Sequence, residues 1–307
     1  MKPEIRINVG GIELVAQEFG EADHPAIVLI MGLGMQMISW PDTFCRSLAE
    51  RGFRVIRFDN RDAGLSHKVE GVRAPGAIKM LLASKLGIRL SVPYELRALA
   101  DDTVGLLDAL KLDAAHIVGA SMGGMVAQLV AAHYPGRVLT LTSIMSTSGN
   151  PKLPQPSAKV LLRLAAKAAT DEKSYLESAL QTWRIIGSPA YQPSDEELSE
   201  RLLAAYRRSY YPAGTARQMA AISACGSRVE ALKTIRAPTL VIHGKDDVLV
   251  PVTGGIDTAK HIPGARLELI EGMGHDLPTP LLPTFVELIG SHALASVRSE
   301  SATHQSR

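Results

Sequence analysis

The sequence predicts an α/β fold, with a mostly parallel central sheet, helices on both faces and an inserted helical cap. Two observations support this prediction. Short continuous apolar runs, typical of buried parallel strands, alternate with helix-like segments of about 10 to 15 residues. One stretch, residues 147–237, interrupts the alternation and holds helix-like segments only. At 307 residues the chain is long for one core and short for two, which favours one main domain carrying an insertion.

The first half of the chain supplies four of the expected strands. They cover residues 12–19, 26–31, 54–58 and 116–120. Helices are expected at residues 41–51, with a proline near the start, and at residues 96–110. A smaller insertion, about residues 67–93, contains the apolar run 78–88 and is expected to border the pocket.

The second half continues the alternation on both sides of the cap. Strands are expected at residues 138–143, 239–243 and 267–270, and helices at residues 122–133 and 279–289. Within the cap, helices are expected at residues 158–169, 172–186, 195–206 and 215–225. The chain therefore divides into a core of residues 1–146 and 238–290 and a cap of residues 147–237. The polar, Ser-rich tail of residues 291–307 is expected to be disordered.

Composition excludes several classes of function. The net charge is +2, with Lys and Arg scattered among Asp and Glu, so the basic stripe of a nucleic-acid-binding protein is missing. No apolar stretch reaches the roughly 18 residues of a membrane span, and the first residues lack the apolar core of a signal peptide. We therefore expect a cytoplasmic protein. Cys45 and Cys225 have no CxxC spacing and are expected to be reduced, and no metal site is expected.

A candidate nucleophile lies where a strand-like run meets a helix-like run. The pentapeptide from Gly119 to Gly123 has Ser121 at its centre. A strand that turns sharply into a helix strains the central residue, and only small residues fit two positions to either side. Ser121 is therefore expected to project above the sheet edge. The alternative is a glycine-rich strand-to-helix turn with an idle serine, but every element that a nucleophile turn requires is present in the right order, which favours the nucleophile.

A serine hydroxyl is a poor nucleophile at neutral pH and needs a neutral imidazole to accept its proton. Nine histidines compete for this role. His275 lies in a Gly-rich loop after the last expected strand, where α/β folds place their chemistry, and it has the chain order of a Ser, acid, His triad. We expect His275 to be the base, with His67 as the second candidate.

The base needs a carboxylate that fixes its tautomer and stabilises the imidazolium. Two neighbouring candidates, Asp246 and Asp247, follow the expected strand 239–243. Adjacent side chains in an extended loop point in different directions, so only one can serve. We prefer Asp247 and assign Asp246 to a turn or helix cap.

Ester cleavage builds negative charge on the carbonyl oxygen, which two backbone amides commonly stabilise. Met122 follows the nucleophile, and Leu33 lies in the loop after residues 26–31, so these two amides are the expected oxyanion hole. Gly32 and Gly34 could also begin a dinucleotide-binding motif, but Met37 stands where that motif needs its third glycine, so this alternative is excluded.

Several methionines fall in loops that should surround Ser121. Methionine adapts to irregular apolar shapes, which favours a tolerant apolar pocket, although ordinary core packing explains each methionine equally well. The tentative substrate-contacting residues are Met31, Met35, Trp183 and Met273.

Four segments together resemble the α/β-hydrolase superfamily, and within it the group of aclacinomycin methylesterase and small bacterial carboxylesterases. They are the segment from Met31 to Gly34, residues 58–66, the Ser121 pentapeptide and the segment from Gly272 to His275. The likeness runs from about residue 12 to residue 289. It implies ester hydrolysis without a cofactor, amides supplied by Leu33 and Met122, and Asp247 as the acid. Met31 stands where many relatives carry histidine.

These observations predict a serine hydrolase that cleaves carboxylic esters of small, apolar molecules through an acyl-enzyme. Thioesterase, lactonase, carbon–carbon bond hydrolase and cofactor-free perhydrolase activities use the same triad and stay open. A ligand receptor that keeps the triad without turnover is the alternative of another class. The sequence does not indicate an oligomeric state.

Overall fold

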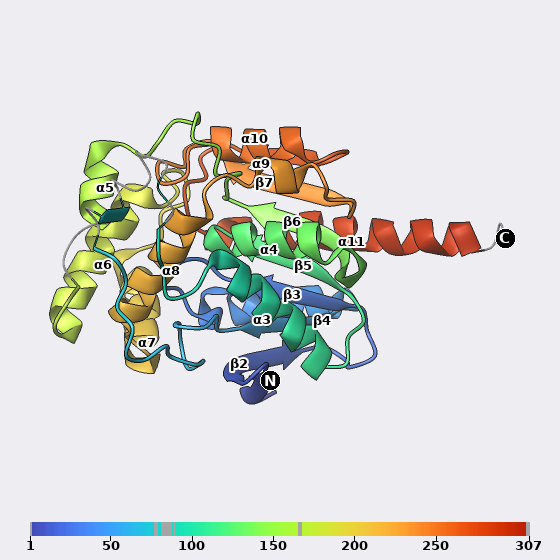
Figure 1. Cartoon of the computed structure of the whole chain (residues 1–307), viewed down its shortest axis with the longest axis horizontal. Helices are drawn as coiled ribbons and strands as arrows, with labels where there is room; N and C mark the ends of the chain where they lie inside the picture. The colour runs from blue at the N-terminus through green and yellow to red at the C-terminus, as the bar shows by residue number, and fades with distance from the viewer. Residues whose placement is uncertain (1, 77–78, 81–87, 89, 165–167, 305–307) are drawn as a thin grey trace.

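The computed structural model describes residues 2–76, 79–80, 88, 90–164 and 168–304, and it centres on one eight-stranded sheet (Figure 1). The strand order is β1-β2-β4-β3-β5-β6-β7-β8. The six strands from β4 to β8 in this order run parallel, while β1 and β2 form an antiparallel hairpin at one edge. The carboxyl ends of the six parallel strands therefore meet at one edge, where α/β folds place ligands.

The expected strands are confirmed to within one residue at each end. The strands are β1 (Ile5–Val9), β2 (Ile12–Phe19), β3 (Ala26–Ile30), β4 (Arg54–Phe58), β5 (Ala115–Ala120), β6 (Val138–Ile144), β7 (Thr239–Gly244) and β8 (Arg266–Ile270). β1 was not expected from the sequence. Its side chains alternate between exposed and partly buried, as at an edge strand with one face toward solvent.

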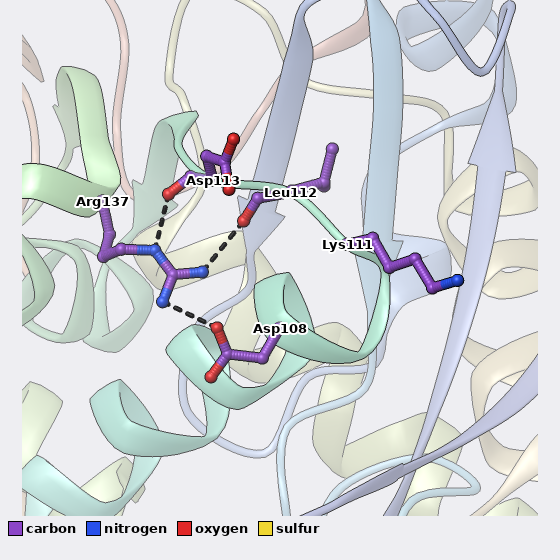
Figure 2. Close-up of a pocket in the computed structure, with 5 residues that line it drawn as sticks. All are labelled: Asp108, Lys111, Leu112, Asp113 and Arg137. Carbon is purple, nitrogen blue, oxygen red and sulfur yellow. Dashed lines mark hydrogen bonds and ion pairs between the residues drawn. The ribbon is translucent and has the colours of Figure 1, made fainter.

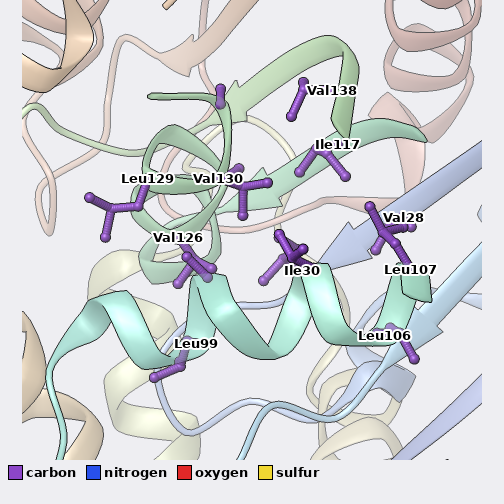
Figure 3. Close-up of a cluster of buried hydrophobic side chains, with 14 of the residues drawn as sticks. Val28, Ile30, Leu99, Leu106, Leu107, Ile117, Val126, Leu129, Val130 and Val138 are labelled. Atoms are coloured by element: carbon purple, nitrogen blue, oxygen red, sulfur yellow. The ribbon is translucent and has the colours of Figure 1, made fainter. Parts of the chain in front are cut away.

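Helices cover both faces of the sheet. The core helices are α1 (Asp42–Glu50), α3 (Leu96–Ala109), α4 (Met122–His133), α10 (Thr253–His261) and α11 (Leu282–His304). Figure 3 shows α3 and α4 packing on one face, where Val28 and Ile30 of β3 point. Ile27 and Leu29, which alternate with them along the strand, point to the other face, into a cluster with side chains of α1 and α11. This alternation buries β3 on both faces and explains its continuous apolar sequence.

A run of helices separates β6 from β7. It comprises α5 (Ala158–Leu164), α6 (Glu172–Ile186), α7 (Asp195–Arg208), α8 (Pro212–Cys225) and α9 (Val229–Leu232). Asp171 and Ser194 begin α6 and α7 by accepting backbone N–H bonds from Ser174 and Glu197. Figure 1 shows α5 to α8 gathered at one end of the sheet, whereas Leu232 of α9 packs in the cluster beneath α4.

Residues 291–304 are helical, which differs from the expectation of disorder. Helix α11 begins in the core, where Phe285 and Ile289 are buried, and continues to His304. Five of the eight residues from 293 to 300 are Ala, Leu, Arg or Glu, and these good helix formers allow the helix to continue. Of the expected apolar run 78–88, all but residues 79, 80 and 88 lie outside the described residues.

No helix in the described part of the chain is both long enough and apolar enough to cross a membrane. The cytoplasmic location stays a prediction from the sequence.

Candidate active site

Ser121 lies alone between the end of β5 and the start of α4. Its backbone has φ 56° and ψ −119°, which is a strained conformation for a residue with a side chain. The turn needs glycine on either side. A Cβ at Gly119 would lie 2.1 Å from the carbonyl oxygen of Gly123, and a Cβ at Gly123 would lie 2.0 Å from that of Ile30. The Ser121 amide donates to the carbonyl of Ile144 on β6 at 2.9 Å, which fixes the turn to the sheet.

His275 lies between Ser121 and Asp247 and contacts both. Its Nε2 is 2.9 Å from Ser121 Oγ, and its Nδ1 is 2.6 Å from Asp247 Oδ2. An ionised carboxylate only accepts hydrogen bonds, so in the neutral ring Nδ1 carries the proton and Nε2 is free to accept one. The imidazole is therefore arranged to take the Ser121 proton.

The Asp247 carboxylate is fully buried and has a partner at each oxygen. Oδ1 accepts from the amides of Leu249 and Val250 at 2.9 and 2.7 Å, while Oδ2 faces His275. Burial alone would raise the pKa of Asp247, but the neighbouring charge of His275 and hydrogen bonds from His243 and His275 lower it to about 2. The carboxylate is therefore ionised at neutral pH.

The loop after β3 lies against the nucleophile. A Cβ built on Gly32 would be 3.1 Å from Ser121 Cβ, so Leu33 follows the point of closest approach. Met122 supplies the first amide of α4, which lacks an intrahelical acceptor. Asn60 Nδ2 donates to the Met31 carbonyl at 3.0 Å and holds the loop from behind. The positions of Leu33 and Met122 are thus next to Ser121.

Helix α7 holds the same loop from the cap side. Gln36 Nε2 donates to the carbonyls of Ala205 and Ser209 at 2.6 and 2.8 Å, and its Oε1 accepts from Arg208. Arg208 also pairs with the buried Asp59 at 2.8 Å. The loop that carries Leu33 is therefore tied to the cap as well as to the sheet.

Helix α8 is anchored by a buried ion pair. Arg217 Nε and Nη2 donate to the two Asp62 oxygens at 2.8 Å each, and Tyr94 donates to Oδ2 at 2.7 Å. Burial would raise the pKa of Asp62, but hydrogen bonds from Arg217 and Tyr94 lower it. This pair joins the cap to the loop that follows β4.

The tentative substrate-contacting residues fall into two groups. Met31 and Met273 are buried in the apolar cluster on the α1 and α11 face. Met35 and Trp183 are partly exposed. Of these four residues, Met35 and Trp183 have the most surface open to a bound molecule.

Three residues near the site were not identified from the sequence: Ser188, Gln218 and Asp276. Gln218 Oε1 accepts from the Gly34 amide at 2.8 Å, across 184 positions of sequence, and Ser188 contacts Asp276 across 88. No local pattern indicates contacts of this range. The position of Asp276 directly after His275 was the only available signal.

A hollow of about 450 Å³ lies at the opposite end of the strands, just before β5 begins, and Figure 2 shows the residues that line it. Each guanidinium nitrogen of Arg137 has a partner there, with bonds to the carbonyls of Asp113 and Leu112 at 2.6 and 2.9 Å and an ion pair with Asp108 at 2.7 Å. These contacts tie the loop after α3 to the turn before β6. Groups of side chains suited to hold a metal ion do not occur among the described residues.

Comparison with known sequences and structures gives a consistent picture. A model of the alpha/beta hydrolase fold family matches residues 25–278. Rhodomycin D methylesterase DauP from a Streptomyces species is 31% identical over 96% of this chain and 99% of its own length. A putative carbamate hydrolase, RutD from Variovorax paradoxus, is 30% identical over 83% of this chain and 86% of its own.

Solved structures share the architecture. A meta-cleavage product hydrolase from Pseudomonas fluorescens superposes with a TM-score of 0.75 at 21% identity, covering 94% of this chain and 96% of its own. A hydrolase from Pseudomonas aeruginosa superposes with a TM-score of 0.72 at 27% identity, covering 96% of this chain and 98% of its own.

Proposed function

Because the chain belongs to the α/β hydrolase fold family, we propose that it is a serine ester hydrolase in which Ser121 is the nucleophile, His275 the general base and Asp247 the orienting acid. One observation carries this assignment. Hydrogen bonds run without a break from the Asp247 carboxylate through both ring nitrogens of His275 to the Ser121 hydroxyl.

The reaction follows from this geometry in two halves. Ser121 Oγ attacks the ester carbonyl while Nε2 of His275 takes its proton, and the imidazolium is stabilised by Asp247. The amides of Leu33 and Met122 donate to the oxyanion. His275 then protonates the departing alcohol. Water, activated by the same imidazole, releases the acid from Ser121. These steps use no cofactor.

The expected substrate is a small-molecule carboxylic ester. The first relative described above is named a methylesterase, and it aligns with almost the whole chain, cap included. In the cap of residues 147–237, the partly exposed Trp183, together with Met35 of the core, would contact an apolar part of the substrate. Met31 and Met273 would support that surface from behind.

Covalent labelling and turnover test the proposal together. We expect a fluorophosphonate probe to label the wild type and not Ser121→Ala, and Ser121→Ala and His275→Ala to lose hydrolysis of 4-nitrophenyl acetate by about 10⁴-fold or more. His133→Ala, on a surface helix end, is the matched control and should hydrolyse normally. Hydrolysis by Ser121→Ala at the wild-type rate would overturn the assignment.

Matched substrates separate the activities that share this triad. Other relatives are named 3-oxoadipate enol-lactonase 2 and 2-hydroxy-6-oxononadienedioate/2-hydroxy-6-oxononatrienedioate hydrolase, at 25% and 29% identity. We expect a methyl ester to be cleaved with a higher kcat/KM than a lactone or thioester of similar size. Labelling without turnover of any substrate in the panel would favour a ligand receptor instead.

A further inference from the structure

A segment of the cap lies along the loop that carries His275. The segment covers residues 186–190, at and just after the end of α6. The His275 amide donates to the Ile186 carbonyl at 2.7 Å, and the Ala190 amide donates to the Gly272 carbonyl at 3.2 Å. The backbone of the base is therefore bonded directly to the cap.

Ser188 is the centre of this contact. Its side chain is buried, and its Oγ accepts from the Gly274 amide at 2.9 Å while donating to Asp276 Oδ1. The Ser188 amide donates to the same Asp276 oxygen at 3.0 Å. One cap residue thus binds the residue before His275 and the residue after it.

The two backbones pack without free space between them. A Cβ built on Gly274 would lie 2.5 Å from the Gly187 carbonyl oxygen and 2.7 Å from that of Ile186. The Gly187 amide still donates to Trp183 in the last turn of α6, at 2.8 Å. A displacement of α6 therefore moves the His275 loop with it.

We propose that Ser188 and Asp276 are positioning residues that hold the His275 imidazole toward Ser121, so that the cap takes part in activating the nucleophile. This inference rests on the proposed function. Misplacement of a catalytic group by about 1 Å can slow a reaction about a hundredfold. The effect should appear even with substrates and probes too small to contact the cap helices.

Purely structural behaviour is the competing explanation, and it predicts a different result. If the Ser188 contacts only stabilise the fold, a variant would melt at lower temperature yet label and turn over normally while folded. If they only shape the substrate site, KM would rise and labelling by a small probe would not change.

The experiment compares two serines at opposite ends of one helix. Ser188→Ala removes the hydroxyl that binds Gly274 and Asp276. Ser174→Ala is the matched control, because Ser174 belongs to the capping box at the start of α6, far along the helix from His275. Ser188→Thr keeps the hydroxyl and tests rescue. The readouts are the rate of fluorophosphonate labelling, and kcat and KM for 4-nitrophenyl acetate, at a temperature where circular dichroism shows each variant folded.

We expect Ser188→Ala to lower the labelling rate and kcat at least about tenfold with KM changed less than about twofold. Ser188→Thr should recover most of both rates, and Ser174→Ala should match the wild type. Asp276→Ala, which removes the other partner, should behave like Ser188→Ala and gives an independent test.

Wild-type labelling and kcat in both Ser188→Ala and Asp276→Ala would overturn the positioning role. A rise in KM alone would also overturn it. Failure of the proposed function is distinguishable, because the wild-type protein itself would then resist the probe or Ser121→Ala would keep its activity.

Discussion

Asp246 and Asp247 are neighbours in sequence, and their carboxylates have different hydrogen-bond partners. Asp247 is buried and faces His275, whereas Asp246 is exposed and accepts from the Gly272 amide at 2.9 Å. Both face the loop between β8 and His275. Only Asp247 contacts the imidazole, so the two residues form a natural pair for comparison.

We predict that Asp247→Asn lowers kcat for a 4-nitrophenyl ester by about 10⁴-fold, because an amide can stabilise the wrong tautomer of His275 and carries no charge to oppose the imidazolium. Asp246→Asn keeps an oxygen acceptor for Gly272 and should lose less than about tenfold. Steady-state kinetics on both purified variants measure this. Equal losses in the two variants would contradict the assignment of Asp247.

The sequence indicated Ser121, His275 and Asp247 because each has a local signal. Ser121 has glycines at both flanking positions of the turn, His275 lies in a Gly-rich loop, and the carboxylates directly follow a strand. Ser188 has no such signal, because its proposed role depends on a contact between the end of α6 and the loop after β8, which is more than 80 residues further along the chain. Long-range contacts of that kind depend on tertiary packing, which no local pattern reports.

Strand β5 contains His116, a buried histidine that lies outside the proposed triad. His116 is fully buried, its Nδ1 lies 2.9 Å from Thr140 Oγ1, and its Nε2 has no hydrogen-bond partner in the described part of the chain. Burial, together with a smaller contribution from nearby His292, lowers the pKa of His116 to about 4. The folded protein therefore holds this ring neutral.

We predict that His116 makes stability depend on pH between about 6.5 and 4. The unfolded chain takes up a proton near pH 6.5 and the folded chain only near pH 4, so the stabilisation is complete above pH 6.5 and is lost as the pH falls to 4. The loss should be roughly 3 kcal/mol. Urea unfolding at pH 7 and pH 4.5 measures it, and His116→Gln should show a smaller change. An equal change in both proteins would contradict the prediction.

Strand β5 ends at the turn that carries Ser121, where the backbones of Gly119 and Gly123 lie very close together. We predict that Gly119→Ala destabilises the protein by at least about 2 kcal/mol and lowers kcat, because the new Cβ must displace the Gly123 backbone. Gly136→Ala is the control, since a Cβ there meets nothing within 4 Å. Thermal melting and ester hydrolysis measure both variants. A Gly119→Ala protein with wild-type melting and activity would contradict the prediction, because it would show that the turn can accommodate a Cβ.

Strong apolar runs made most elements of the core predictable, and two weaker elements were missed. The five residues of β1 are half exposed, so they lack a continuous apolar run. Helix α10 contains Gly254 and Gly255, which lower helix propensity, yet Gly255 lies so close to His243 of β7 that a Cβ there would be 2.4 Å from Nδ1. Tertiary packing overrides propensity at that position.

At the scale of the whole molecule, the cap is joined to the core through buried charge. Arg217 and Asp62 are 4% and 1% exposed, and their bidentate pair lies between α8 and the loop after β4. A buried ion pair adds little stability compared with apolar packing of the same volume. Removing one partner, however, leaves the other charge buried without a counter-ion, which is strongly destabilising. The cap therefore depends on the pair staying complete.

We predict that Arg217→Met destabilises the protein by about 3 to 5 kcal/mol, because Asp62 is left buried without its cation. Adding Asp62→Asn should recover about half of the lost free energy of unfolding, since it removes the unpaired buried charge. Arg207→Met breaks the exposed pair with Glu172 and should leave the unfolding midpoint unchanged. Chemical denaturation measures all four proteins. A single variant as stable as the double variant would contradict the buried-charge argument.

The direction of α11 bears on how the enzyme can be attached to a solid support. Figure 1 shows its last turns leaving the body of the molecule at the end opposite α5 to α8. The N-terminal end behaves differently, because Glu4 binds Arg208 of α7 at 3.1 Å. Tethering to a resin through the C-terminal helix should leave substrate entry and turnover intact, whereas a tether at the first residues would pull on the helix that secures Gln36.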